Sequence, residues 1–199
     1  FKDEVGTATG ALWQRSHYPS TPSGNSYIRV FEKYIAAHPN IRVITDIEAK
    51  DILKNAEGRV TGVLAKDNKT GRYTLFTAEK GVIIATGGFG ANVKLRQEVN
   101  TGVFKDYDLG KSIGCTNFQK SAQGDGILMG KEIGANVIGM ADIQVHPCGT
   151  PGTGLMEMIR TSGRNRVFIN TDGNRFVNEG AARDVLAKAI FAQKGSTYY

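Results

Sequence analysis

Apolar residues between positions 26 and 38 recur at steps of three and four, which places them on one face of a helix. The next apolar run, residues 41–44, predicts a short strand. Glycine-containing turn signals then separate three further runs, a spacing that is typical of a small antiparallel sheet. These runs are residues 49–54, 59–66 and 72–77.

Residues 81–86 (GVIIAT) show a different pattern, because apolar and β-branched side chains follow one another without alternation. Such a run is typical of a central strand that is buried on both faces of a parallel sheet. After it, residues 92–99 predict a short helix and residues 100–121 an irregular stretch. Residues 125–133 predict a second helix, which Gly134 should close as a C-cap residue.

The C-terminal part continues this mixture of elements. Residues 142–146 are expected to be extended, residues 166–170 to form a strand, and Asp172-Gly173 to form a turn into another strand. Residues 184–193 predict a last helix. It should point four apolar side chains inward: Val185, Leu186, Ala189 and Ile190. No internal repeat is visible, and the order of the elements predicts an α/β or α+β fold.

The composition is that of an ordinary globular protein, with 40% hydrophobic and 22% charged residues, and argues against disorder. No window approaches roughly eighteen consecutive apolar residues, so we expect no membrane span in this chain. The chain begins Phe1-Lys2-Asp3-Glu4, with neither an initiator methionine nor the apolar segment of a signal peptide. We therefore expect it to begin inside a longer protein or after processing. A cytoplasmic and an exported location both stay open.

The net charge of +6 comes from 25 basic and 19 acidic residues, which are scattered along the chain. A nucleic-acid-binding protein would gather this excess on one stripe, so we expect no nucleic-acid partner. The densest basic group, Arg160, Arg164 and Arg166, suits a small anion, because arginine binds carboxylate and phosphate in bidentate geometry. The two cysteines, Cys115 and Cys148, lack the spacing of a metal site or a redox dithiol.

Glycine is over-represented, since 25 glycines in 199 residues exceed the usual share of about 7%. Gly87, Gly88 and Gly90 follow the apolar run, and glycines at the end of a buried strand allow a ligand to approach the backbone. A tight turn without a ligand explains them equally well. The GxGxxG fingerprint of dinucleotide-binding proteins is absent, so these glycines can form only half of a nucleotide site.

Three further residues are candidates for chemistry, each with a structural alternative. Asp125 can cap the predicted helix or accept a hydrogen bond from a ligand hydroxyl, and its flanking glycines clear space for a ligand. His146 precedes Pro147 and a glycine-rich loop, where functional residues concentrate, although a lone histidine is commonly structural. Arg183 stands unfavourably at a helix N-terminus, where a surface ion pair with Asp184 is the structural alternative.

Four motifs in order resemble the FAD-dependent fumarate reductase and succinate dehydrogenase flavoprotein family. They are residues 85–90 (ATGGFG), 124–126 (GDG), 146–147 (HP) and 170–184, which read N-x-x-G-x-R-F-x-x-E-x-x-x-R-D. The soluble, single-chain branch, which includes fumarate, urocanate and related enoate reductases, is the most similar. The resemblance extends from about residue 15 to the C-terminus.

The resemblance implies FAD as the cofactor, with contacts from three parts of the chain. The implied FAD-binding residues are Ala49, Ala85, Thr86, Gly87, Gly88 and Asp125. It also implies that His146 holds a substrate carboxylate and that Arg183 donates the proton, while flavin N5 delivers hydride to the other alkene carbon. Because free arginine is a very weak acid, desolvation and a developing carbanion must assist this step, and Glu179 or Asp184 could return the proton.

The resemblance implies a second substrate contact within residues 156–160, although an alignment without a gap places Met158 and Ile159 at the family's Thr-Glu pair. Glu157 and Arg160 keep its Glu-x-x-Arg spacing and are the further predicted substrate-binding residues. Met156 stands where the fumarate reductases carry a threonine, so urocanate and other enoates stay open beside fumarate.

We therefore predict that residues 1–140 are the later part of a Rossmann-like FAD-binding domain with a small antiparallel sheet. Residues 141–199 would begin a substrate-capping domain, with the active site at the junction. The N-terminal dinucleotide strand and the later substrate histidine and arginine of the family have no counterpart, so the chain resembles an internal piece of a larger flavoprotein.

The predicted reaction is flavin-dependent reduction of the C=C bond of an α,β-unsaturated carboxylic acid, with fumarate to succinate favoured. The electron donor is open, and an attached FMN or haem module is one candidate. Two alternatives remain: a catalytically silent fragment that does not hold FAD alone, and an anion-binding surface at residues 160–166.

Overall fold

The computed structural model describes residues 5–6, 13–14, 16–17, 19, 24–115, 121–147, 149 and 167–196. By its internal contacts the chain divides into two compact units. The first unit comprises Phe1–Val43, Gln144–Cys148 and Glu157–Tyr199, and the second comprises Ile44–Ile143 and Gly149–Met156. The boundary near residue 140 between an FAD-binding and a capping domain stays a prediction.

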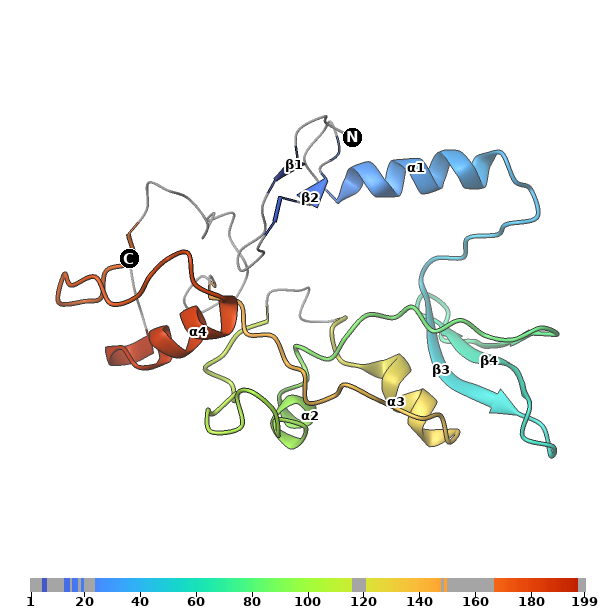
Figure 1. Ribbon diagram of the computed structural model, residues 1–199. Helices are drawn as coiled ribbons and strands as arrows, with labels where there is room; N and C mark the ends of the chain where they lie inside the picture. The colour runs from blue at the N-terminus through green and yellow to red at the C-terminus, as the bar shows by residue number, and fades with distance from the viewer. Residues whose placement is uncertain are drawn as a thin grey trace. The chain divides into compact units, whose positions relative to one another are not determined.

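The second unit contains a three-stranded antiparallel sheet in the order β3-β4-β5 (Figure 1). Its strands are β3 (Ile47–Lys54), β4 (Val60–Asp67) and β5 (Tyr73–Thr77), which confirms the predicted small sheet. Gly58 and Gly71 lie in the two connecting turns with φ angles of +81° and +73°. Glycine adopts such angles without the steric cost that a Cβ atom brings, so these two residues fix where the chain reverses.

A β-bulge interrupts β3 near its start. Ala49 pairs with Ala65 and Asp51 pairs with Leu64, so Lys50 is an extra residue without a partner on β4. A bulge bends its strand and changes the direction of the side chains beside it. The irregularity therefore falls next to Ala49, one of the predicted FAD contacts.

Two helices of the second unit confirm the helices predicted from residues 92–99 and 125–133. They are α2 (Val93–Glu98) and α3 (Asp125–Glu132). The Asn92 side chain caps α2, because its Oδ1 accepts a hydrogen bond of 3.0 Å from the Leu95 N–H. Gly134 follows α3 with φ +86°, as expected for a residue that ends a helix.

Strand β3 and helix α3 contact one another. The Lys54 ammonium group on β3 donates a hydrogen bond to the Ile133 carbonyl at the C-terminal end of α3. A positive charge is favourable at this end of a helix, because the last carbonyl groups have no partner within the helix. Lys54 therefore helps to hold α3 against the sheet. The apolar core of this unit consists of Ile52, Ala65, Leu95, Phe104, Leu109, Cys115, Ala122 and Met129.

The prediction of a central strand at residues 81–86 is wrong for the described part of the chain. The segment pairs with no strand there, and Ile83 and Ile84 are 93% and 45% exposed. Residues 41–44 also form no strand, and Val43 is 64% exposed. A strand needs a neighbouring strand to complete its backbone hydrogen bonds. A run of β-branched residues shows only that extended backbone is locally favoured.

The first unit contains α1 (Asn25–Ala36) and α4 (Arg183–Phe191), which confirm the two helices predicted there. This unit also contains the short antiparallel strands β1 (Val5–Gly6) and β2 (Ser16–His17). A 3₁₀ turn, η1 (Lys194–Ser196), follows α4.

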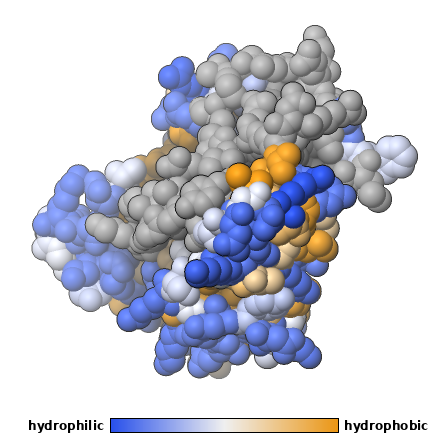
Figure 2. All heavy atoms as spheres, turned by 90° about the vertical axis from the view of Figure 1, so that its left-hand side faces the viewer, coloured by the Kyte–Doolittle hydropathy of each residue, from blue (hydrophilic) through white to orange (hydrophobic). Residues whose placement is uncertain are grey.

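The helices α1 and α4 differ in how much apolar surface they bury. Leu186 and Ile190 on α4 are buried as predicted, whereas Val185 is 48% exposed. No residue of α1 is buried, and its apolar residues Val30 and Phe31 are more than half exposed. In the space-filling view, apolar side chains in orange lie at the surface among hydrophilic ones in blue (Figure 2). None of the helices in the described ranges combines the length and apolar character that crossing a bilayer requires.

The predicted strand–turn–strand after residue 166 is reduced to a turn and one isolated bridge, between Ile169 and Arg175. Gly173 takes φ +79° in the turn, and the Asn170 side chain accepts hydrogen bonds from two backbone N–H groups across it. The two arms are joined by Glu179, which is only 7% exposed. Its Oε1 accepts a hydrogen bond of 2.9 Å from the Phe168 N–H.

The Glu179 carboxylate also forms a bidentate pair with Arg175. The Nε and Nη2 groups of Arg175 donate hydrogen bonds of 3.1 and 2.6 Å to its two oxygens. The hydrogen bond from Arg175, followed by the one from the Phe168 N–H, lowers the pKa of Glu179 from 4.5 to about 2. Glu179 is therefore a fixed anion that fastens the turn.

The variant Glu179→Gln should change how the stability of the protein depends on pH. Because folding lowers the pKa of Glu179, its ionised form stabilises the fold above pH 4.5, and this contribution is lost as the pH falls toward 2. The variant should be less stable at pH 7 and should lose stability less steeply between these two pH values. Denaturant midpoints measured across this range test the prediction.

Asp172→Asn provides the control, because it removes an exposed carboxylate from the same turn. It should keep the pH dependence of the wild type. Equal pH dependence in the wild type and Glu179→Gln would contradict the assignment of Glu179 as the anion that fastens the turn.

Candidate functional site

The glycine pair at residues 87–88 presents an open backbone edge. Gly87 has φ +79°, and a Cβ atom built on either glycine would meet nothing within 4 Å. Both residues are exposed, and in the described ranges no hydrogen bond engages their N–H groups. The segment therefore offers a flat ligand close access to backbone donors.

The N-terminus of α3 packs against this same segment. A Cβ atom on Gly126 would lie 2.5 Å from Ile84 Cγ2 and would also overlap Thr86 Oγ1. A Cβ atom on Gly124, which has φ +83°, would lie 2.8 Å from Phe89 Cβ. The expectation that these two glycines clear space for a ligand is therefore wrong, because the protein's own atoms fill that space. They permit the helix to approach the segment closely.

Asp125 stands between these glycines at the start of α3. The N-cap position belongs to Gly124 and carries no side-chain cap, so Asp125 does not serve as the cap. Its carboxylate is exposed and accepts no hydrogen bond from the described residues. The pKa of Lys50 is raised, chiefly by its hydrogen bond with Glu48 and in smaller part by the charge of Asp125. An acceptor beside the open glycine edge is thus available to a ligand hydroxyl.

These features fit the cofactor that the resemblance implies. FAD brings a phosphate-linked chain and ribose hydroxyls, and it requires close backbone approach, N–H donors and a carboxylate acceptor. The second unit brings all of these to one place, at residues 85–88 and at Asp125. Ala49 lies on β3, which contacts α3, and is half-buried beside the bulge. Its contact with FAD stays a prediction.

A second candidate cluster lies in the first unit and joins α4 to residues 144–146. Arg183 is the first residue of α4, and its Nη1 donates a hydrogen bond of 2.8 Å to Gln144 Oε1. The Nε atom of Arg183 is buried and has no hydrogen-bond partner among the residues that the structure describes. Within the part of the chain that the structure describes, Arg183 makes no ion pair with Asp184, so the structural alternative is not realised.

An unpaired buried donor costs free energy, about 1–3 kcal/mol by comparison with other proteins. Such a donor in a native protein calls for an explanation, and a ligand that completes the hydrogen bond is one. His146 is half-buried and stands two residues after Gln144, so both belong to the segment that contacts Arg183. The first unit therefore presents a guanidinium group that is fixed on one side and unpaired on the other.

Gln144 is the functional candidate that sequence reasoning missed. It was visible only as a neighbour of His146, and its partner Arg183 is 39 positions away in the sequence. Glu157 and Arg160 lie outside the described residues, so their role in substrate binding stays a prediction. Glu179 is held by Arg175, with a pKa of about 2, and is a poor carrier of protons near neutral pH. Asp184 remains the candidate to return a proton.

Comparisons with known proteins identify the family of this chain. The model of the family described as FAD binding domain matches residues 4–197. The NADH:acrylate oxidoreductase of Vibrio harveyi is 37% identical over 190 residues, which cover 95% of this chain and 18% of that protein. The urocanate reductase of Eggerthella lenta is 34% identical over 187 residues, covering 93% of this chain and 30% of that protein.

A solved structure is also similar to this chain. The open conformation of a flavocytochrome c3 fumarate reductase superposes with a TM-score of 0.75 at 29% sequence identity. The match covers 98% of this chain and 33% of that chain. The chain thus spans a third or less of the length of these relatives.

Gly126→Ala should destabilise the protein by about 1–3 kcal/mol, the usual cost of an extra methyl group in a tightly packed place. The new methyl group would overlap Ile84 and Thr86. Gly130→Ala is the matched control on the same helix, because its methyl group would lie at ordinary contact distances of 3.6 and 3.7 Å. It should be neutral or stabilising, since alanine favours helix by up to about 1 kcal/mol over glycine.

Chemical denaturation of both variants measures the difference. Equal stability of Gly126→Ala and Gly130→Ala would contradict the close approach of α3 to residues 84–86.

Proposed function

Because this chain belongs to the FAD binding domain family, we propose that the protein containing it reduces the C=C bond of an α,β-unsaturated carboxylic acid with the help of FAD. The family confirms the predicted resemblance, the mixed fold with a small antiparallel sheet, and FAD as the cofactor. The single observation that carries the proposed reaction is Arg183, fixed by Gln144 and left with a buried, unpaired Nε.

The proposed substrate is a small unsaturated acid, and fumarate is the first to test. The relatives are named for acrylate, urocanate and fumarate, all of which carry a carboxylate conjugated to a C=C bond. A carboxylate of this kind can accept hydrogen bonds from His146 and from a guanidinium group. Met156 departs from the fumarate reductase pattern, which keeps urocanate and other enoates beside fumarate as alternatives.

In the proposed reaction, the second unit holds the cofactor and the first unit handles the proton. The backbone of residues 85–88 and the Asp125 carboxylate would bind FAD, with Ala49 as a further contact. When bound, FAD supplies the hydride that adds to one alkene carbon. The other alkene carbon then carries the electron pair that must take up a proton.

Arg183 would supply that proton. Its guanidinium is oriented by the hydrogen bond from Nη1 to Gln144, so the unpaired Nε has a defined direction. Free arginine is a very weak acid, and its donation requires an equally basic acceptor such as a developing carbanion. His146 would hold the substrate carboxylate, and with Glu157 and Arg160 it completes the proposed substrate site. Asp184 would help to return a proton to Arg183.

The electron donor is proposed to be an attached module that carries FMN or haem. Among the relatives, one is named an NADH oxidoreductase and another a flavocytochrome, so different donors serve similar chains. The relatives are several times longer than this chain, which leaves room for such a module in a longer protein.

Arg183→Ala should lower turnover by about 100- to 10,000-fold, the range that general acid catalysis contributes, while the bound flavin is retained. Oxidation of reduced viologen dye with fumarate, acrylate and urocanate side by side measures this loss and identifies the substrate. Lys194→Ala, which removes an exposed positive charge from the first unit, is the control and should keep full turnover. Full turnover by Arg183→Ala would overturn the assignment of the proton donor.

A second possibility is that these 199 residues alone hold no FAD and are catalytically silent. The unpaired apolar segment at residues 81–86 favours it, because Ile83 is 93% exposed directly before the glycine edge. We expect the isolated chain to bind FAD more weakly than the longer protein. The visible absorption of oxidised flavin in the purified chain tests this, and stoichiometric flavin in the isolated chain would contradict it.

A further inference from the structure

Arg96 is a buried cation whose hydrogen bonds, among the described residues, all go to backbone carbonyl groups. It lies on α2 and is only 5% exposed. No ion pair involves it among the residues that the structure describes. Burial lowers the pKa of Arg96, yet its guanidinium stays protonated at neutral pH because arginine is so weak an acid. A buried positive charge is costly unless hydrogen bonds compensate it.

Backbone carbonyl groups supply that compensation. Arginine has five N–H donors in a rigid plane, and five carbonyl oxygens surround this one. Nε donates a hydrogen bond of 2.6 Å to the Leu109 carbonyl, and Nη1 donates one of 2.8 Å to the Gly90 carbonyl. The remaining acceptors are the carbonyl groups of Gly110, Ile113 and Gly114.

One of these acceptors, the Gly90 carbonyl, lies two residues after the candidate cofactor-binding residues 85–88. Gly90 ends the glycine-rich segment that begins with Gly87 and Gly88, and the other four acceptors lie in the loop at residues 109–114. Arg96 therefore connects Gly90, which follows the exposed pair Gly87-Gly88, to a loop that lies about 20 positions further along the chain. A Cβ atom on Gly90 would lie 3.1 Å from the Cys115 sulfur, so this loop packs directly against Gly90.

Neighbouring hydrogen bonds extend the connection to the start of α3. The Asn92 side chain donates a hydrogen bond of 3.0 Å to the Gln123 carbonyl, and the Ala91 N–H donates one of 2.9 Å to the Ala122 carbonyl. Residues 90–92 are thereby connected both to the loop at residues 109–114, through Arg96, and to the segment that leads into Asp125. The two predicted FAD-contacting parts, residues 85–88 and Asp125, share this anchor.

We propose that Arg96 is a positioning residue for FAD, which fixes Gly90 and thereby holds the backbone of residues 87–90 in the conformation that accepts the cofactor. The inference rests on the proposed function, because it concerns the same FAD site. Lysine cannot replace Arg96 in this role, since an ammonium group has three donors and no planar fork. Gly87 and Gly88 have no side chain that could restrict their backbone conformation. The hydrogen bond from Arg96 to Gly90 restricts it instead.

The test compares Arg96→Met and Arg96→Lys in the flavoprotein that contains this chain. FAD is removed and then titrated back at a temperature where circular dichroism shows each variant folded. Both variants should bind FAD at least about tenfold more weakly, the change that losing one charge-assisted hydrogen bond produces. The anisotropy of flavin fluorescence at saturation should also fall, because the cofactor would be held less rigidly.

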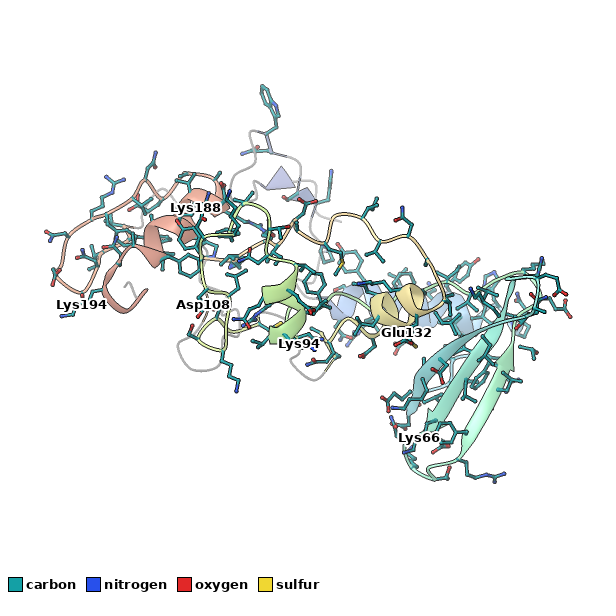
Figure 3. All side chains as sticks on the ribbon, turned by 90° about the horizontal axis from the view of Figure 1, so that it is seen from below. Lys66, Lys94, Asp108, Glu132, Lys188 and Lys194 are labelled. Carbon is teal, nitrogen blue, oxygen red and sulfur yellow. The ribbon has the colours of Figure 1, made fainter. Side chains whose placement is uncertain are left out.

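Lys94→Met is the matched control, because Lys94 carries the same charge on the same helix but is exposed (Figure 3). It should bind FAD as the wild type does. Wild-type affinity in a folded Arg96→Met, or equal weakening in Lys94→Met, would overturn the inference. Weakened binding by Arg96→Met that Arg96→Lys fully restores would show that charge alone suffices, and would overturn the positioning role.

If Arg96→Met does not fold, hydrogen exchange of the wild type decides the question. FAD should slow amide exchange at residues 109–114 as well as at residues 87–90, because Arg96 joins the two segments. Unchanged exchange at residues 109–114 would contradict the inference. A wild-type protein that binds no FAD would overturn the proposed function itself, whereas normal FAD binding by the folded variants would overturn only the role of Arg96.

Discussion

The close approach of α3 to residues 84–89 is the constraint on which the candidate cofactor site depends. Gly124 and Gly126 have no side chains, so the first turn of the helix can touch Ile84, Thr86 and Phe89. Any Cβ atom at these two positions would force the helix away. The approach brings the Asp125 carboxylate beside the open glycine edge, and Lys54 fixes the far end of α3 to the sheet.

Hydrogen bonds from cations to backbone carbonyls connect several segments of the second unit. The sheet has three strands, and the segment that leads into the glycine edge pairs with none of them. Arg96 and Lys54 instead donate to carbonyl groups of loops and of a helix end. Such hydrogen bonds fix the conformation of irregular backbone, which non-directional apolar packing does not do. They therefore suit a site that is built from loop residues.

In the first unit, two arginines differ in the hydrogen-bond partners that the protein provides for their N–H groups. Arg175 donates two hydrogen bonds to the Glu179 carboxylate and stabilises the turn. Arg183 donates one hydrogen bond to Gln144, and within the described part of the chain its buried Nε has no partner. The Arg175 groups that bind Glu179 have their partner within the protein, whereas Arg183 Nε is a donor that a bound ligand could use. For this reason Arg183 carries the proposed chemistry.

The amino-acid sequence by itself determined the four longer helices, the glycine turns of the sheet and the order of motifs that identifies the family. These are local properties, because residue periodicity and glycine's positive φ act within a few positions. Tertiary structure alone decided that residues 81–86 lack a strand partner, that Gly126 packs on Thr86, and that Gln144 binds Arg183. The physical reason is that burial and hydrogen-bond partners depend on which distant segments meet, and local sequence patterns do not encode that.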